Sequence, residues 1–270
     1  MNPTVGVIGA GRMGAPIIGH LVRKGFETHA CDVNPARQAL VSGHAAKWAG
    51  DAATLAPLCD VILVCVGFDA EVRSLLAEGG ALRCVRAGTI VAILSTVHPD
   101  TVKELAAQAE PRGVHVVDST VCRGGEAADQ GTLLSFVGGE PEVVARLMPV
   151  LKAYSADVVH TGGIGTAQVA KAVNNLILWA CLVADHEGLA LAQHHGVDIE
   201  ALRKALLLSS CTNGPLEKWG TQTMAWAEDD MAIVGEMAAQ AGISMPQAGV
   251  NREVCRALKP KRYQLELYGR

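Results

Sequence analysis

The sequence lacks several features that would each point to a particular class of protein. Aromatic residues make up only 4% of the 270 residues, so alanine, valine and leucine must supply most of the core. The 27 acidic residues outnumber the 23 basic ones, which argues against a surface that binds nucleic acid by charge. The longest apolar run, Leu176–Ala184, is well short of the ~20 residues that a membrane-spanning helix needs.

Metal-binding and export signals are also missing. The eight cysteines show none of the close spacings of zinc sites or redox pairs, and scattered cysteines are typical of reduced core thiols in a cytosolic protein. His194 and His195 are adjacent, so on a helix they point ~100° apart and do not share a metal ion. A strand-like run begins at Val5, which leaves no room before it for a signal peptide. We therefore expect a soluble, cytoplasmic protein without a resident metal.

The first part of the chain alternates between short apolar runs and helix-like stretches. The run Val61–Val66 is apolar throughout, as expected of a strand buried on both faces of a parallel sheet. This alternation predicts an α/β fold with a doubly wound parallel sheet. The expected strands are Val5–Ile8, Thr28–Cys31, Val61–Val66, Thr89–Leu94 and Val114–Val117, and expected helices between them include Ala10–Lys24 and Asp100–Ala109.

Strand signals end at about residue 160, and helical ones follow. Gly165–His195 contains no proline and is followed by Gly196, a common residue at the end of a helix. Asp198–Ser209 and Asp230–Gly242 also indicate helices, with Pro246 as a breaker after them. We therefore predict two domains, an α/β domain of residues 1–162 and an all-helical domain of residues 163–270.

A glycine-rich turn joins the first expected strand to the first expected helix. Between a strand and a helix, the pattern GxGxxG is a specific sign of dinucleotide binding. Its glycines permit a tight turn, the approach of a diphosphate and close helix–strand packing, while the helix N-terminus offers N–H groups to the phosphates. The residues of the turn are Gly9, Ala10, Gly11, Arg12, Met13 and Gly14.

Asp32 ends the second expected strand, where a carboxylate can accept hydrogen bonds from the adenosine ribose. The same charge would repel a 2′-phosphate, and no arginine follows directly. Arg37 is the nearest residue that could bind such a phosphate. The sequence therefore favours NAD as cofactor, with NADP as the second candidate. A turn-forming aspartate before Asn34-Pro35 is the alternative interpretation of Asp32.

Lys171 and Asn175 lie four residues apart in the long expected helix, so both project from one face. Ala170 and Ala172 flank the lysine, and an apolar setting favours the neutral amine that a general acid/base uses. Asn175 can hold a substrate oxygen against that amine. On spacing alone, a surface lysine on an alanine-rich helix explains the pattern at least as well.

Four segments match, in order, the motifs of one enzyme family. They are residues 6–16, Gly-Val-Ile-Gly-Ala-Gly-Arg-Met-Gly-Ala-Pro; residues 93–99, Ile-Leu-Ser-Thr-Val-His-Pro; residues 118–124, Asp-Ser-Thr-Val-Cys-Arg-Gly; and residues 163–175, which include Lys171 and Asn175. On these residues the chain resembles the β-hydroxyacid dehydrogenases, which include 3-hydroxyisobutyrate dehydrogenases and tartronate semialdehyde reductases. The resemblance runs from about Thr4 to Ala257.

This resemblance implies a Rossmann domain followed by an all-helical domain, with the active site in the cleft. It implies reversible oxidation of a small β-hydroxyacid to its semialdehyde or keto acid. Lys171 would be the acid/base, and Asn175, assisted by Asn174, would orient the substrate. Besides the glycine turn, the implied cofactor contacts are Asp32, Val66, Ser95 and Thr96.

The implied substrate loop, Cys122, Arg123 and Gly124, departs from the family pattern, which usually reads Ser-Gly-Gly. An arginine offers a positive fork suited to a carboxylate, sulfonate or phosphate. The loop therefore predicts a substrate whose anionic group is larger or displaced, and an arginine turned outward to solvent is the alternative. Cys122 is expected to replace the serine and not to act as a nucleophile.

A second departure concerns Asp229 and Asp230, which stand where the family carries a Lys-Asp pair. The stretch between Lys171 and this point is also shorter than in the family. The resemblance therefore does not establish that this chain binds its substrate as the family does. An exposed aspartate at a helix start is the simpler interpretation of Asp229, and binding of a cationic substrate group is the other.

Two other functions remain open at this point. Imine reductases share the fold but usually lack a lysine at the position of Lys171, and non-catalytic cofactor-binding relatives tend to lose it. The resemblance, together with the apolar face of the long helix, also predicts a homo-oligomer, either a dimer or a tetramer. The expected partners are thus a small anionic substrate and further copies of the chain, with no nucleic acid and no membrane.

Overall fold

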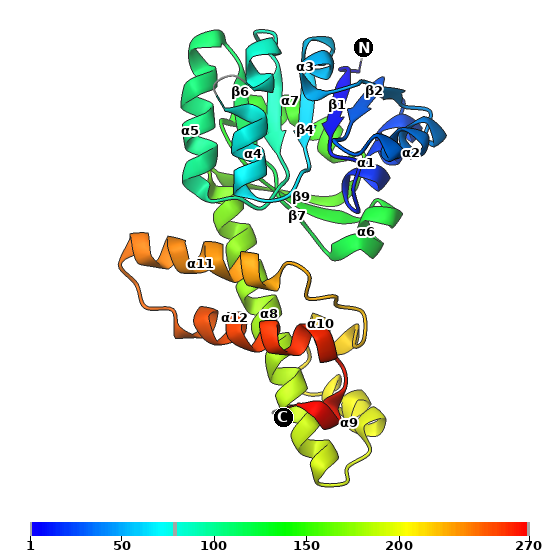
Figure 1. Ribbon diagram of the computed structural model, residues 1–270, viewed down its shortest axis with the longest axis vertical. Coiled ribbons are helices and arrows are strands. Elements are labelled where there is room, and N and C mark those ends of the chain that lie inside the picture. The colour runs from blue at the N-terminus through cyan, green and yellow to red at the C-terminus, as the bar shows by residue number, and fades with distance from the viewer. Residues whose placement is uncertain (1, 78–79, 269–270) are drawn as a thin grey trace. The chain divides into compact units, whose positions relative to one another are not determined.

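The computed structural model describes residues 2–77 and 80–268 (Figure 1). The chain divides into two compact units, Met1–Lys171 and Ala172–Arg270. This division lies within helix α8 (Thr166–His194), beyond the predicted domain boundary after residue 162. The first residues of α8 belong to the first unit because Ala167 and Gln168 are buried there against the ends of its strands.

The first unit is built on one sheet with the strand order β3-β2-β1-β4-β5-β6-β8-β7, and β9 pairs with β8. The parallel strands are β1 (Val5–Ile8), β2 (Thr28–Cys31), β3 (Lys47–Trp48), β4 (Val61–Val64), β5 (Ile90–Ile93) and β6 (His115–Asp118). Strand β8 (Leu133–Gly138) runs antiparallel to β6 and β7 (Val121–Cys122) and parallel to β9 (Ser155–Gly162). The predicted fold class and the five predicted strands are therefore confirmed, with shifts of a residue or two at some ends.

Successive strand residues point to opposite faces of this sheet and build two cores. Val5, Val7 and Leu63 belong to one core, whereas Ile62 and Val64 belong to the other. Helices α1, α6 and α7 supply side chains to the first core, and α3, α4 and α5 to the second. The bounds are α1 (Gly14–Arg23), α2 (Gln38–Gly43), α3 (Ala52–Leu55), α4 (Asp69–Leu76), α5 (Pro99–Ala109), α6 (Gly124–Gln130) and α7 (Pro141–Leu151).

In the second unit the described residues contain helices and no strand. Side chains of α8, among them Trp179 and Leu182, form a core with Met231 of α11 and Cys255 of α12. The remaining bounds are α9 (Ile199–Leu206), α10 (Gly214–Glu217), α11 (Ala227–Ala241) and α12 (Pro246–Leu258). The predicted helical character is confirmed, but Pro246 begins a helix instead of only ending a pattern, because proline suits the first helical turn.

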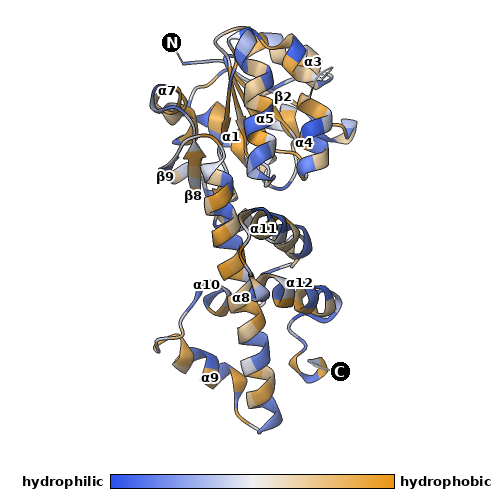
Figure 2. Cartoon of the chain, turned by 90° about the vertical axis from the view of Figure 1, so that its left-hand side faces the viewer, coloured by the Kyte–Doolittle hydropathy of each residue, from blue (hydrophilic) through white to orange (hydrophobic). Residues whose placement is uncertain are grey.

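Among the described residues, α8 is the one helix long and apolar enough to cross a membrane by length and composition (Figure 2). Its most apolar window has a mean hydropathy of 1.4, and 39% of that window is buried inside the protein. The core helices of soluble proteins meet the same criterion. Helix α8 also carries the polar side chains of Gln168, Lys171 and Asn175.

Candidate active site

In the glycine turn between β1 and α1, two glycines have no room for a Cβ atom and the third has room for one. A Cβ atom on Gly9 would lie 2.2 Å from the Cys65 carbonyl oxygen, and one on Gly14 would lie 1.9 Å from that of Gly9. Nothing lies within 4 Å of a Cβ built on Gly11. Gly9 and Gly14 thus serve close backbone packing, whereas Gly11 leaves space through which a diphosphate can approach.

The start of α1 suits a bound anion. Within the described chain no side chain caps this helix end, and its first turn holds no acidic residue. The first N–H groups of a helix lack partners inside the helix, and the helix dipole makes this end positive. The turn that contains Arg12 and Met13 therefore fits the diphosphate of a dinucleotide.

Asp32, just after β2, holds this turn in place. One of its carboxylate oxygens accepts a hydrogen bond from the Ala10 N–H at 2.7 Å, and the other accepts one from the Asn34 N–H at 2.8 Å. The second bond is the turn-forming interaction of the alternative interpretation. Each carboxylate oxygen can still accept another bond, so Asp32 retains the capacity to bind ribose hydroxyls.

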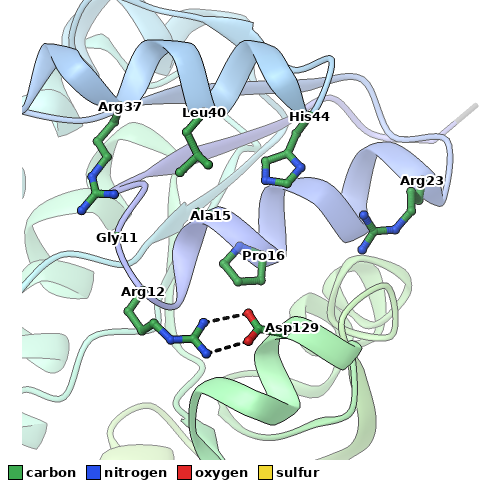
Figure 3. A pocket seen from close by; sticks show the side chains of 9 residues that line it. All are labelled: Gly11, Arg12, Ala15, Pro16, Arg23, Arg37, Leu40, His44 and Asp129. Carbon is green, nitrogen blue, oxygen red and sulfur yellow. Dashed lines mark hydrogen bonds and ion pairs between the residues drawn. The ribbon is translucent and has the colours of Figure 1, made fainter.

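A pocket of ≈ 480 Å³ opens beside Gly11, between α1 and α2 (Figure 3). Arg12, Arg23 and Arg37 are among the residues that line it, so it is suited to a negatively charged ligand. Asp129 of α6 partly offsets this charge, because both of its oxygens lie 2.7 Å from the guanidinium nitrogens of Arg12. Arg37, the nearest residue after Asp32 that could bind a 2′-phosphate, is one of the residues that line this pocket.

The loops after β4 and β5 are joined by one hydroxyl group. Ser95 Oγ accepts a hydrogen bond from the Val66 N–H and donates one to the Val66 carbonyl, both at 3.0 Å. Ser95 is buried and the neighbouring Thr96 is half-buried. These are the two segments that the resemblance assigns to the cofactor beyond the glycine turn, and the structure brings them together.

The buried carboxylate of Asp118, which the sequence did not reveal as functional, caps the start of α8. Asp118, at the end of β6, accepts hydrogen bonds from the Gly165 and Gln168 N–H groups at 2.8 and 2.9 Å. Burial raises the pKa of Asp118 above its usual range, although these backbone bonds act in the opposite direction. The only signal in the sequence is that a buried helix start needs acceptors for its N–H groups.

Lys171 lies further along α8 and points back to the substrate loop. Its Nζ atom donates a hydrogen bond to the Val121 carbonyl at 2.8 Å and lies 3.9 Å from Cys122 Sγ. The side chain is partly buried, so the amine is held next to the loop instead of extending freely into solvent.

Arg123 of the same loop has a left-handed backbone conformation, and its side chain is bound by two partners. Its φ angle is 82°, in the left-handed region where a glycine would fit without strain. Its guanidinium lies 2.6 Å from Asp157 of β9 and donates to the Thr132 carbonyl at 3.1 Å. The side chain is 43% exposed. The Arg123 side chain is thus partly exposed and is bound by Asp157 and the Thr132 carbonyl.

Asn174 and Asn175 of α8, and Asp229 and Asp230 of α11, belong to the second unit. Asn174 Nδ2 donates to Asn175 Oδ1 at 2.9 Å, and Asn175 is buried. Its amide group can still donate to a substrate oxygen. Asp230 is also buried and accepts a hydrogen bond from Trp179 Nε1 at 2.9 Å, whereas Asp229 is exposed in the first turn of α11. Asp230 thus serves the helical core.

In the described part of the chain, no three His, Cys, Asp or Glu side chains are grouped to hold a metal ion. In the first unit the Lys171 amine contacts the Val121 carbonyl, and the glycine turn and the loops after β4 and β5 follow the carboxyl ends of parallel strands. In doubly wound sheets this edge is the usual place for a ligand.

Both parts of the chain match known protein families. Residues 4–163 match the family described as "NAD binding domain of 6-phosphogluconate dehydrogenase", and residues 165–265 match "NAD-binding of NADP-dependent 3-hydroxyisobutyrate dehydrogenase". The chain is 32% identical to the NAD-dependent L-serine dehydrogenase of Pseudomonas aeruginosa, over 79% of this chain and 72% of that protein. It is 30% identical to a 3-hydroxyisobutyrate dehydrogenase of the same organism, over 78% and 72%.

A solved structure shares the fold over nearly the whole length. The 3-hydroxyisobutyrate dehydrogenase of Mycobacterium tuberculosis, determined with L-serine, superimposes with a TM-score of 0.87. The two chains are 22% identical, and the match covers 97% of this chain and 95% of the other. At this level of identity the likeness is evidence of a common fold.

Proposed function

The chain belongs to the β-hydroxyacid dehydrogenase family, and on that premise we propose which of its residues perform the reaction. Its members transfer a hydride between a nicotinamide cofactor and a small β-hydroxyacid or its semialdehyde. The observation that carries the proposal is the 2.8 Å hydrogen bond from Lys171 Nζ to the Val121 carbonyl. It fixes an amine beside the substrate loop, in the same unit as the glycine turn.

The cofactor would be held by the glycine turn, with Asp32 at the adenosine ribose and Val66, Ser95 and Thr96 along the remainder. When bound, it supplies or accepts the hydride. We propose NAD as the preferred cofactor, because the Asp32 carboxylate would repel a 2′-phosphate. Arg37, which lines the pocket, is the residue that would allow NADP to bind as well.

Lys171 would be the general acid/base. In the oxidation direction, its neutral amine takes the hydroxyl proton of the substrate as the hydride leaves the carbon. In reduction, the ammonium returns a proton to the carbonyl oxygen, so charge and protons balance. The Val121 carbonyl accepts only one of the N–H groups of the ammonium, which leaves others for the substrate.

The substrate would be bound through its anionic group by Cys122, Arg123 and Gly124, while Asn175 and Asn174 orient the reacting oxygen. Arg123 would have to release Asp157 before it could bind that group. The pair with Asp157 is partly exposed, and exposed ion pairs contribute little free energy, so exchange for a substrate anion is feasible.

Cofactor absorbance tests the proposal. Wild type and Lys171→Ala are assayed with NADH and NADPH against small acidic semialdehydes, including sulfonated ones, and a cyclic imine. We expect turnover of an acid with NADH and a loss of about 10²-fold or more in the variant, the scale of a lost acid/base. Lys152→Ala, at an exposed lysine of the same unit, is the matched control.

Three results would contradict this proposal. Equal rates for wild type and Lys171→Ala would remove the lysine from the chemistry. Turnover of the imine alone would favour an imine reductase. Cofactor binding without turnover of any compound would favour a non-catalytic cofactor-binding protein.

We further propose that the protein is cytoplasmic and a homo-oligomer. Helix α8 leaves Val173 and Ile177, one turn apart, 52% and 58% exposed. Apolar side chains that recur on one helix face are usually covered by a partner. Sedimentation velocity distinguishes a monomer from a dimer or tetramer, and a monomer at micromolar concentration would contradict the proposed assembly.

A further inference from the structure

Gln168 is a buried polar residue whose three hydrogen bonds reach two different parts of the first unit. Only 1% of its surface is exposed. Its Oε1 atom accepts a bond from the Val97 N–H at 3.0 Å, and its Nε2 atom donates to the Ser95 carbonyl at 2.9 Å. Its backbone N–H donates to Asp118 at 2.9 Å. One residue thus ties α8 to the loop after β5 and to the end of β6.

This arrangement fixes the register of Lys171. Gln168 and Lys171 are three residues apart in α8, so they lie on neighbouring positions of one helix face. Gln168 holds the loop that contains Ser95, and Ser95 in turn holds Val66. Lys171 donates to the Val121 carbonyl at the start of β7, the short strand that follows β6. The amine and both implied cofactor loops are therefore joined through a short chain of buried and partly buried bonds.

The side chain at this position must donate and accept at once. Glutamine pairs with a backbone N–H and a backbone carbonyl of the same loop, as a neighbouring strand would. An ionised glutamate can only accept, and a methionine can do neither with comparable strength. The bonds are buried, so a lost partner is not replaced readily by water.

We propose that Gln168 is a positioning residue, which sets the separation between the Lys171 amine and the loop at Ser95–Val97 that lies along the cofactor. The inference rests on the proposed function, because it assigns to Gln168 an effect that acts through Lys171. The scale of the effect follows from geometry: a displacement of ~1 Å in a reacting group can cost about 10²-fold in rate.

The test is a double-mutant cycle in the full-length protein with Gln168→Glu and Lys171→Ala. We expect Gln168→Glu to lower kcat by about 10- to 10²-fold, with little change in the KM of the substrate or the Kd of NADH. In the Lys171→Ala background the same change should have almost no further effect on kcat, because residues that act as a unit are not additive. Gln193→Glu, at an exposed position of the same helix, is the matched control.

The pH profile gives a second readout that a purely structural role would not produce. A protonated glutamate regains a donor for the Ser95 carbonyl and still accepts from the Val97 N–H. The rate of Gln168→Glu relative to wild type should therefore rise as the pH falls. Gln168→Met, which has no titratable group, should show a relative rate that does not depend on pH, and it replaces Gln168→Glu in the cycle if the buried charge prevents folding.

The outcomes separate this inference from the function on which it rests. No turnover by wild type, or full activity of Lys171→Ala, overturns both. Loss of activity in Lys171→Ala with equal, additive losses from Gln168→Glu in both backgrounds overturns only the role of Gln168. The same holds if Gln168→Glu behaves like Gln193→Glu, or if neither variant at Gln168 folds, since the residue would then serve the fold alone.

Discussion

The starts of helices α1 and α8 present the same physical feature in opposite ways. At α1 no side chain in the described residues caps the helix, and Gly11 faces open space. At α8 the buried carboxylate of Asp118 accepts two of the first N–H groups. A positive helix end attracts an anion in both cases. The uncapped end of α1 suits the phosphates of a ligand, whereas the protein's own carboxylate caps α8 and thereby holds the start of the helix that carries Lys171.

The largest effect in this comparison is expected at Gly14. An alanine there would place its Cβ atom 1.9 Å from the Gly9 carbonyl oxygen, so the turn must shift and the start of α1 with it. We expect Gly14→Ala to lose at least ~1–3 kcal/mol of stability, the usual range for overpacking, or to fail to fold. Thermal unfolding measures this directly.

Gly11→Ala is the control for that substitution. Nothing lies within 4 Å of the added atom, so stability should stay unchanged while the Kd of NADH rises by about tenfold, or ~1.4 kcal/mol. Equal unfolding temperatures for the two variants would show that the turn is not closed at Gly14. An unchanged Kd in Gly11→Ala would show that the open position does not face the cofactor.

A smaller loss of stability is expected when Asp118, the carboxylate at the start of α8, is replaced by an amide. Asp118→Asn leaves one acceptor oxygen for two backbone N–H groups, so one of them meets an amide nitrogen instead. We expect a loss of ~1–3 kcal/mol in the free energy of unfolding, the cost of a buried group without its partner. Denaturant titration of wild type, Asp118→Asn and Asp157→Asn measures it.

Asp157→Asn serves as the reference because it breaks the partly exposed ion pair with Arg123. Such pairs contribute only ~0–1 kcal/mol. Equal losses of stability in the two asparagine variants would show that Asp118 stabilises the protein no more than the partly exposed ion pair of Asp157 does.

The smallest effect concerns Arg12 at the open helix end. Its pair with Asp129 is about half exposed, and Asp129→Asn would release the guanidinium toward the phosphates. We expect NADH to bind a few-fold more tightly, since exposed pairs are worth at most ~1 kcal/mol, and the gain should shrink at higher salt because of screening. Fluorescence titration measures the Kd; a gain that persists in Arg12→Ala/Asp129→Asn would exclude Arg12 as its source.

The sequence predicted those features that depend on neighbouring residues. The glycine turn, the alternating strands and helices, and the placement of Lys171 and Asn175 on one helix face all follow from local spacing. Asp118 and Gln168 were missed because their hydrogen-bond partners lie far away in the chain, at Gly165, Ser95 and Val97. No periodicity records such pairs, which form only when the sheet brings its loops together.

Arg123 illustrates the same limit from the other side. Its charge and its position in the substrate loop favoured a role in binding an anion, and the arginine does pair with one, the carboxylate of Asp157. That partner lies in a strand that the sequence did not predict, β9. Whether a substrate anion displaces Asp157 depends on the relative affinity of two carboxylates, which spacing along the chain does not encode.

The division of the chain just after Lys171 has a consequence for how this enzyme could diversify. The amine, the glycine turn and the loops joined by Ser95 and Gln168 all belong to one unit, so their spacing is inherited together. Residues 172–270, which include Asp229 at the position that the resemblance assigns to a lysine, can then change by mutation without altering that spacing. Substitutions in the second unit would thus leave the residues proposed for proton transfer and cofactor binding in the first unit in their relative places.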